Sequence, residues 1–148
     1  MVVSHAAHKV YKIKYHIVIC IKYRKKMLLS DERISFFKNV LSEIGKRYDL
    51  RFDAIGTDGD HVHLFVDAPP KYSPSNIFRI VKSITAREML TRFPEIKEDL
   101  WGGEFWNDGG YVGTVGEGTT AEIVRNYILR QGSKKEKEGY RQFKLTEL

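Results

Sequence analysis

The sequence predicts an α+β fold of the ferredoxin-like type, an antiparallel sheet with helices on one face, followed by a C-terminal helix. Apolar residues alternate in period two over strand-like segments, and they recur at helical spacing over others. Turn signals separate these segments in the order β-α-β-β-α-β. The 148 residues match one ordinary domain in length, so we expect residues 1–148 to form a single domain.

The first strand is expected from Val10 to Arg24, because its residues alternate between an apolar and a more polar face. The apolar face comprises Tyr11, Ile13, Tyr15, Ile17, Ile19, Ile21 and Tyr23, and the other face comprises Lys12, Lys14, His16, Val18, Cys20 and Lys22. A strand with this pattern should pack one face on the core.

Ser30 is expected to cap the first helix, because its hydroxyl can accept a hydrogen bond from the first turn. Asp31 and Glu32 follow in that turn, where the helix dipole favours acidic side chains. Apolar residues then recur at helical spacing to about Lys46. They are Ile34, Phe37, Leu41 and Ile44.

Two further strands are expected at Leu50–Thr57 and His61–Asp67. The dipeptide Asp58-Gly59 between them is a tight-turn signal, so they should form a hairpin. The Pro69-Pro70 pair should end the second of these strands, because proline cannot donate to a ladder.

The second helix is expected to begin at Ser73-Pro74, an N-cap followed by proline at the first helical position. It should run to about Arg92, ahead of Pro94. Its apolar stripe comprises Ile77, Ile80, Val81 and Ile84.

The glycine- and aromatic-rich stretch from Trp101 to Gly116 is expected to form a loop and then a strand around Tyr111–Val115. The last helix should run from about Thr120 to Gln131. Thr119 with Glu122 forms a capping box ahead of it, and Gly132 stands where a C-terminal glycine cap belongs.

The chain is basic, with a net charge of +6 and a pI near 9.4, and this level makes nucleic acid a candidate partner. Seven Lys or Arg residues and no acid occur between Lys9 and Lys26. Lys134, Lys135 and Lys137 form a second cluster. A solvated surface that keeps the protein soluble is the alternative explanation.

Cys20 is the only cysteine, which excludes an internal disulfide and a cysteine-based zinc cage. The sequence has no apolar run of about 18 residues, the length that suggests a membrane span. Residues 1–10 lack a signal-peptide core. We therefore expect a cytoplasmic protein without a membrane partner.

The strand His61–Asp67 places two histidines on one face, because side chains alternate along a strand. Val62, Leu64 and Val66 should face the helices, and His61 and His63 should share the opposite face. Two imidazoles at this spacing can converge on one metal ion. The alternative is a pair of surface histidines on a half-exposed strand.

The last helix places Tyr127 and Gln131 four residues apart, and therefore on the same face. Ile123 lies one turn before Tyr127 on that face, and Val124 and Ile128 mark the adjacent stripe. From periodicity alone, Tyr127 is an ordinary half-buried helix tyrosine.

Taken together, these segments resemble the single-tyrosine transposases of the HUH endonuclease superfamily, which the smallest insertion sequences encode. The resemblance covers nearly the whole chain. Its pieces are Tyr15-His16-Ile17-Val18 with Lys22-Tyr23-Arg24, Asp60-His61-Val62-His63-Leu64-Phe65-Val66, Phe93-Pro94-Glu95-Ile96, Leu100-Trp101-Gly102-Gly103, Gly110-Tyr111 with Thr114-Val115-Gly116, and Asn126-Tyr127-Ile128 through Gln131.

The resemblance implies that Tyr127 is a nucleophile, that His61 and His63 bind a metal ion, and that Gln131 completes the metal site. It implies cleavage and rejoining of single-stranded DNA at hairpin-bearing element ends, through a 5′-phosphotyrosine link. It also implies a homodimer in which the tyrosine helix can serve either its own or the partner's histidines. No small-molecule substrate is expected.

The resemblance implies Mg²⁺ or Mn²⁺ as the cofactor. Imidazole ligands by themselves favour zinc, nickel or manganese, whereas magnesium prefers oxygen ligands. Gln131 and a DNA phosphate would supply oxygens. We therefore expect manganese to bind more tightly than magnesium.

Two groups of basic residues are candidates for phosphate contacts, which position DNA without reading its sequence. They are Lys22, Arg24 and Lys25 after the first strand, and Arg79, Lys82 and Arg87 on the second helix. Tyr111, Trp106 and Phe105 are candidates for stacking on unpaired bases. Plain surface charge and core aromatics are the alternatives.

Three other functions remain open from the sequence. The first is a non-catalytic nucleic-acid-binding module, since the fold hosts many functions. The second is a replication initiator or relaxase, although these often carry a tyrosine pair where this helix has one. The third is a domesticated relative that processes chromosomal repeat hairpins by the same chemistry.

Overall fold

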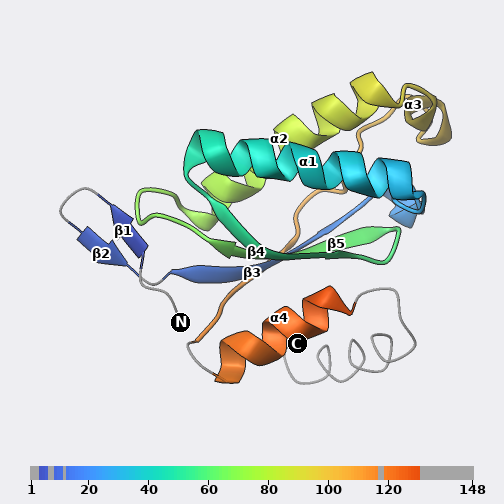
Figure 1. The fold of residues 1–148 in the computed structure, drawn as a ribbon. Helices are drawn as coiled ribbons and strands as arrows, with labels where there is room; N and C mark the ends of the chain where they lie inside the picture. The colour runs from blue at the N-terminus through green and yellow to red at the C-terminus, as the bar shows by residue number, and fades with distance from the viewer. Residues whose placement is uncertain (1–3, 7–8, 12, 117–118, 131–148) are drawn as a thin grey trace.

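The computed structural model describes residues 4–6, 9–11, 13–116 and 119–130. Its order of elements confirms the predicted α+β class (Figure 1). The elements are β1 (Ser4–Ala6), β2 (Lys9–Tyr11), β3 (Lys14–Cys20), a short turn of 3₁₀ helix η1 (Lys22–Arg24), α1 (Asp31–Tyr48), β4 (Arg51–Thr57), β5 (His61–Asp67), α2 (Pro74–Arg92), α3 (Glu95–Asp99), β6 (Tyr111–Thr114) and α4 (Thr119–Leu129).

The main sheet has four antiparallel strands in the order β4-β5-β3-β6. Strands β3 and β5 are central, and their register pairs His16 with Phe65 and Val18 with His63. Strand β5 lies between β3 and β4, so the chain passes from β3 through α1 to a strand two positions away. This split βαβ arrangement is the predicted ferredoxin-like topology.

Helices α1 and α2 cover one face of the sheet, and α4 lies on the opposite face (Figure 1). The predicted caps at Ser30 and Ser73 are present. The Ser30 hydroxyl accepts from the Arg33 N–H at 3.2 Å, and the Ser73 hydroxyl accepts from the Asn76 N–H at 3.1 Å. The core under α1 and α2 includes Ile17, Ile19, Phe37, Leu41, Val62, Leu64, Val66, Ile77 and Val81.

The first strand is shorter than the predicted Val10–Arg24. Strand β2 pairs with β1 in a separate hairpin, and β3 begins at Lys14 and ends at Cys20. Beyond β3, the Lys22 N–H donates to the Phe105 carbonyl and the Arg24 N–H donates to the Ile21 carbonyl. The first bond belongs to a bridge that pairs Ile21 with Trp106, and the positive φ angles of Tyr23 and Arg24 then turn the chain away from the sheet.

Helix α3 was not predicted, because its five residues are too few to show a periodic pattern. Pro94 precedes it with helical φ and ψ of −62° and −21°. Of the residues named above, Lys12, Gln131, Gly132, Lys134, Lys135 and Lys137 lie outside the described part, as do the side chains of Lys9, Val10 and Thr119. Among the described helices, none combines the length and apolarity needed to cross a bilayer.

Lys14 is buried and not part of a solvated basic surface. Its ammonium lies 2.9 Å from Asp53 Oδ2 and 3.3 Å from Asp67 Oδ2, and its side chain is 4% exposed. Arg51 also reaches Asp67, at 3.5 Å. A desolvated carboxylate needs such partners, so this cluster ties β3 to β4 and β5.

We predict that Lys14→Ala lowers the free energy of unfolding by about 3 kcal/mol, because it leaves Asp67 buried with only the half-exposed Arg51 as a cation. Urea unfolding measures the loss. Lys46→Ala is the matched control, since Lys46 pairs with Glu43 in solvent and should cost no more than about 1 kcal/mol. Equal losses in the two variants would contradict the assignment.

Candidate functional site

The histidine pair lies on the face of β5 that α4 covers. His61 and His63 are 4% and 1% exposed, and their ring centroids are 5.1 Å apart. Alternation along the strand places them together, as predicted. The strand is buried on both faces, so the alternative of half-exposed surface histidines is wrong.

Asp60 orients the His61 ring. The Nδ1 atom of His61 lies 2.6 Å from Asp60 Oδ1, and the guanidinium of Arg24 lies 3.4 Å from Asp60 Oδ2. A carboxylate that accepts from Nδ1 fixes the tautomer and the ring plane, as it does for many metal-binding histidines. Nε2 is therefore the nitrogen that His61 would present to a metal ion.

His16 orients the His63 ring in the same way. Its Nε2 atom lies 2.8 Å from His63 Nδ1, and the two rings stack with centroids 5.1 Å apart. No role was predicted for His16, because its place beside His63 follows from the strand register, in which His16 pairs with Phe65 and therefore shares the face of His63.

Burial lowers the pKa values of two of these histidines. The pKa of His63 falls to about 2, first through desolvation and then through the neighbouring His16 and His61. The pKa of His16 falls to about 4 through desolvation. Both rings are therefore neutral near pH 7, which is the form that binds metals or supports a metal-binding ring.

Helix α4 brings Tyr127 to the histidines of the same chain. The Tyr127 ring meets His63 edge to face, with centroids 5.4 Å apart, and the side chain is 4% exposed. Ala54, Phe65, Val124 and Ile128 form the apolar cluster around it. Ile123, which helical spacing places one turn before Tyr127, is 59% exposed instead, because the Val124–Ile128 stripe faces the sheet.

The two imidazoles are suitable metal ligands, because they are neutral near pH 7 or held in place by neighbouring side chains. Two ligands alone do not complete a metal site. Within the described ranges, no group of three or more His, Cys, Asp or Glu side chains is arranged to hold a metal. Gln131, the predicted third protein ligand, lies outside those ranges. Further ligands would come from Gln131, water or DNA.

The basic residues predicted to contact DNA lie in two places. Lys22, Arg24 and Lys25 follow β3 at the end of the sheet where His61 begins β5. Arg79, Lys82 and Arg87 lie on α2, across the sheet from the histidines (Figure 1). The structure therefore brings only the first group to the candidate site.

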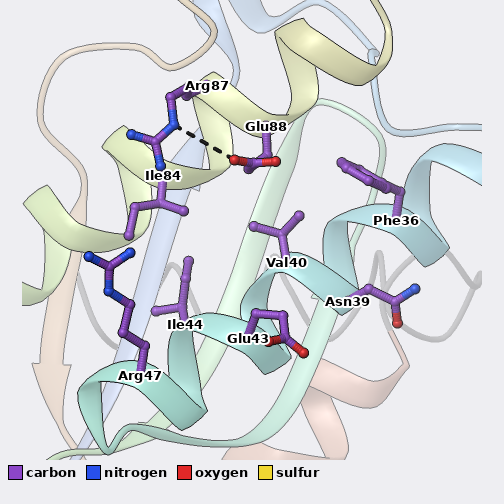
Figure 2. A pocket seen from close by; sticks show the side chains of 9 residues that line it. All are labelled: Phe36, Asn39, Val40, Glu43, Ile44, Arg47, Ile84, Arg87 and Glu88. Atoms are coloured by element: carbon purple, nitrogen blue, oxygen red, sulfur yellow. Dashed lines mark ion pairs between the residues drawn. The ribbon is translucent and has the colours of Figure 1, made fainter.

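The three basic residues of α2 have different surroundings. Lys82 donates to the Asn107 and Gly109 carbonyls, and desolvation lowers its pKa, so it fixes the loop before β6. Arg79 and Arg87 line a hollow of about 440 Å³ between α1 and α2. In the neighbouring hollow, Arg87 pairs with Glu88 over Val40, Ile44 and Ile84 (Figure 2). The charge in this second hollow is mixed, whereas the first is lined by Arg47, Arg79 and Arg87 and by no acidic residue, so only the first suits a polyanion.

The aromatic residues predicted to stack on bases are mostly core residues. Phe105 and Trp106 are 1% and 4% exposed, and the Trp106 indole N–H donates to Thr85 Oγ1 at 2.9 Å. The prediction for these two was therefore wrong, because both pack under the helices. Tyr111 is half-buried with its ring 5.7 Å from that of His16.

Comparisons with known proteins identify the family of the chain. A family model described as "Transposase IS200 like" matches residues 9–131. The ISDra2 transposase TnpA of Deinococcus radiodurans is 35% identical over 125 residues, which cover 84% of this chain and 88% of that protein.

Two solved structures share the fold. A crystal structure of a candidate transposase from Deinococcus radiodurans R1 has a TM-score of 0.69 and 32% identity, covering 88% of this chain and 99% of that one. A REP-associated tyrosine transposase bound to a REP hairpin has a TM-score of 0.58 and 10% identity, covering 84% of this chain and 69% of that one. The second likeness concerns the fold alone.

We predict that the metal-free protein loses stability as the pH falls from about 6.5 towards 4. His16 and His63 have folded pKa values of about 4 and about 2, below the unfolded value of 6.5, so the unfolded chain binds protons first. Their contribution is complete above the unfolded pKa and declines below it. Urea unfolding in chelator at stepped pH measures the decline.

The matched variant is His16→Gln/His63→Gln, which removes both groups from the titration. Its stability should decline less steeply over the same pH window. Parallel curves for the variant and the unmodified chain would contradict the assigned cause.

Proposed function

The chain belongs to the IS200-like transposase family, and on that premise we propose that it cleaves and rejoins single-stranded DNA at insertion-sequence ends, with Tyr127 as nucleophile and Mg²⁺ or Mn²⁺ as cofactor. The observation that carries the proposal is the 5.4 Å approach of the Tyr127 ring to His63. A phenol beside two oriented imidazoles suits metal-assisted cleavage of a phosphodiester by a tyrosine nucleophile.

The reaction is a displacement at phosphorus. The Tyr127 phenol oxygen forms a bond to the scissile phosphorus as the bond from phosphorus to the 3′ oxygen breaks. The phenol loses its proton to solvent, and the departing 3′ oxygen takes one up. The products are a 5′-phosphotyrosine and a free 3′-hydroxyl. When a 3′-hydroxyl attacks the phosphotyrosine, a bond from its oxygen to phosphorus forms and the bond from phosphorus to the tyrosine oxygen breaks. This step rejoins DNA without another energy source.

The protein residues supply orientation more than proton transfer. With a pKa of about 2, His63 is a weak base, so it does not suit the role of proton acceptor for the phenol. His61 and His63 would hold the ion through Nε2, with Asp60 and His16 fixing their rings. A bound divalent ion would supply charge stabilisation at the phosphate oxygens.

Access to the site requires movement of α4. Tyr127, His61 and His63 are each less than 5% exposed, so no phosphate reaches them in the described arrangement. The helix contacts β4 and β5 through the small cluster that contains Ala54, Phe65 and Val124. We infer that α4 separates from this face by several ångströms when DNA binds, while the histidines stay on the rigid sheet.

The proposed DNA partner is a single strand that carries a hairpin, and the proposed assembly is a homodimer. The REP-associated tyrosine transposase of similar fold was solved with a REP hairpin. The 35% identity to an insertion-sequence transposase favours an element end over a chromosomal repeat as the target. The basic residues 22–26 at the His61 end of the sheet offer phosphate contacts for it.

We predict that the chain forms a covalent adduct with single-stranded DNA from the flanks of its own gene. Incubation with Mg²⁺ or Mn²⁺ should give a slower band on a denaturing gel. Tyr127→Phe should lower the yield at least about a thousandfold, because it removes the nucleophilic oxygen and little else. Tyr48→Phe, at the end of α1 and across the sheet from the histidines, is the matched control and should keep the adduct. An undiminished adduct in Tyr127→Phe would exclude Tyr127 as nucleophile.

We predict that calorimetry will show tighter binding of Mn²⁺ than of Mg²⁺, because imidazole ligands favour manganese. Asp60→Ala should weaken Mn²⁺ binding about 10- to 100-fold, because the His61 ring loses its orienting partner. Asp53→Ala, which alters a carboxylate on β4 away from the histidine pair, is the control. Equal affinity for the two metals, or no effect of Asp60→Ala, would count against this donor set.

A further inference from the structure

We propose that Tyr23 and Trp101 form a stacking platform for unpaired bases of the DNA strand next to the cleavage site. Both are aromatic residues that the structure leaves in solvent, with exposed fractions of 53% and 70%. Their rings meet edge to face with centroids 4.9 Å apart. Exposing large aromatic side chains to water is unfavourable. Two such rings held together in solvent therefore indicate a surface that binds a ligand.

Cations surround the aromatic pair. The Lys25 ammonium lies 4.3 Å from the centroid of the Trp101 ring, and the Lys22 ammonium lies 5.9 Å from that of Tyr23. Four of the five residues 22–26 are basic. A surface of aromatic rings and neighbouring cations suits a single DNA strand, because unpaired bases can stack on the rings and phosphates can contact the cations. The charge favours a polyanion over an apolar protein partner.

The backbone is strained at the two aromatic positions. Tyr23 has a φ of 59°, its neighbour Arg24 has 53°, and Trp101 has 53°. Bulky side chains rarely adopt this left-handed region, and such strain persists where the surroundings impose it and a function uses it.

Hydrogen bonds fix both turns. The Lys22 N–H donates to Phe105, and the Trp101 N–H donates to Glu98 at 3.0 Å. Phe105 follows shortly after Trp101 in the chain, so the first bond also ties the two aromatic turns together. The rings are therefore presented to solvent by a fixed backbone.

The platform lies at the end of the sheet where the histidine strand begins. Register pairs Cys20 with His61, so Tyr23 follows β3 at the end where the metal-binding strand begins. Arg24 connects the two directly, since its guanidinium contacts Asp60 and Asp60 holds His61. A base stacked here would place the adjoining phosphate towards the His61 end of the sheet. This inference rests on the proposed function for the identity of the strand.

Fluorescence tests the platform in an intact chain. The sequence has two tryptophans, and the second, Trp106, is 4% exposed. Trp101 emission should therefore report on ligands at the surface. In the Tyr127→Phe chain, which binds without cleaving, an unstructured oligothymidylate should quench this emission. An oligonucleotide of equal length with abasic residues carries the same charge and should leave it nearly unchanged.

Affinity measurements provide the second readout. Trp101→Leu should weaken binding of the oligothymidylate about 5- to 100-fold at fixed salt, because a stacked base is lost. Trp101→Phe should retain affinity within about threefold, since it keeps an aromatic face. Leu29→Ala is the matched control, because Leu29 is an apolar side chain of similar exposure, 63%, with no ring.

Several outcomes would overturn the platform. They are equal affinity for the thymidylate and abasic strands, unchanged emission on binding, or a Trp101→Leu variant that loses self-association but not DNA affinity. Thermal melting shows whether each variant folds. If a Trp101 variant does not fold, the quenching experiment still tests the platform, because it uses a chain that keeps Trp101. Adduct formation by the unmodified chain is scored separately. Quenching without an adduct would refute the proposed chemistry, and an adduct without quenching would refute only the platform.

Discussion

The site depends on one constraint, the burial of the central strand β5 on both faces. Val62, Leu64 and Val66 pack under α1 and α2, while His61 and His63 pack under α4. Covering the second face does two things at once. It holds the Tyr127 ring against His63, and it removes water from imidazoles that must be neutral to bind metal. The same apolar cluster that stabilises α4 therefore assembles the reactive groups.

Buried polar side chains need hydrogen-bond or ion-pair partners within the protein, and residues spread along the sheet provide them. Asp60 contacts His61, and His16 contacts His63. At the far end of the sheet, Asp53 and Asp67 pair with Lys14. These contacts join β3, β4 and β5, so the imidazoles proposed to bind metal are held by several strands. The helix that carries the proposed nucleophile is attached through a much smaller cluster. Fixed ligands with a movable nucleophile suit an enzyme that must cut one strand and join another.

Much of this could be predicted from the sequence, because local patterns are short-range. Helix caps at Ser30 and Ser73, the hairpin at Asp58-Gly59 and the shared face of the two histidines follow from spacing alone. The rest depends on contacts between distant segments. The role of His16 requires the β3–β5 register, and the exposure of Trp101 and burial of Trp106 depend on how a glycine-rich loop packs. After Cys20, Ile21 bridges to Trp106, far along the chain, before the positive φ angles of Tyr23 and Arg24 turn the chain.

The central claim is that two imidazoles of β5 and the Tyr127 phenol act on the same phosphate through one ion. Anomalous diffraction from crystals grown with Mn²⁺ and uncleaved single-stranded DNA tests it most directly. The account predicts one strong peak within coordination distance of Nε2 of both His61 and His63, with a Tyr127 oxygen facing the scissile phosphorus. A peak on other ligands, or a Tyr127 remote from every histidine pair of the assembly, would contradict it.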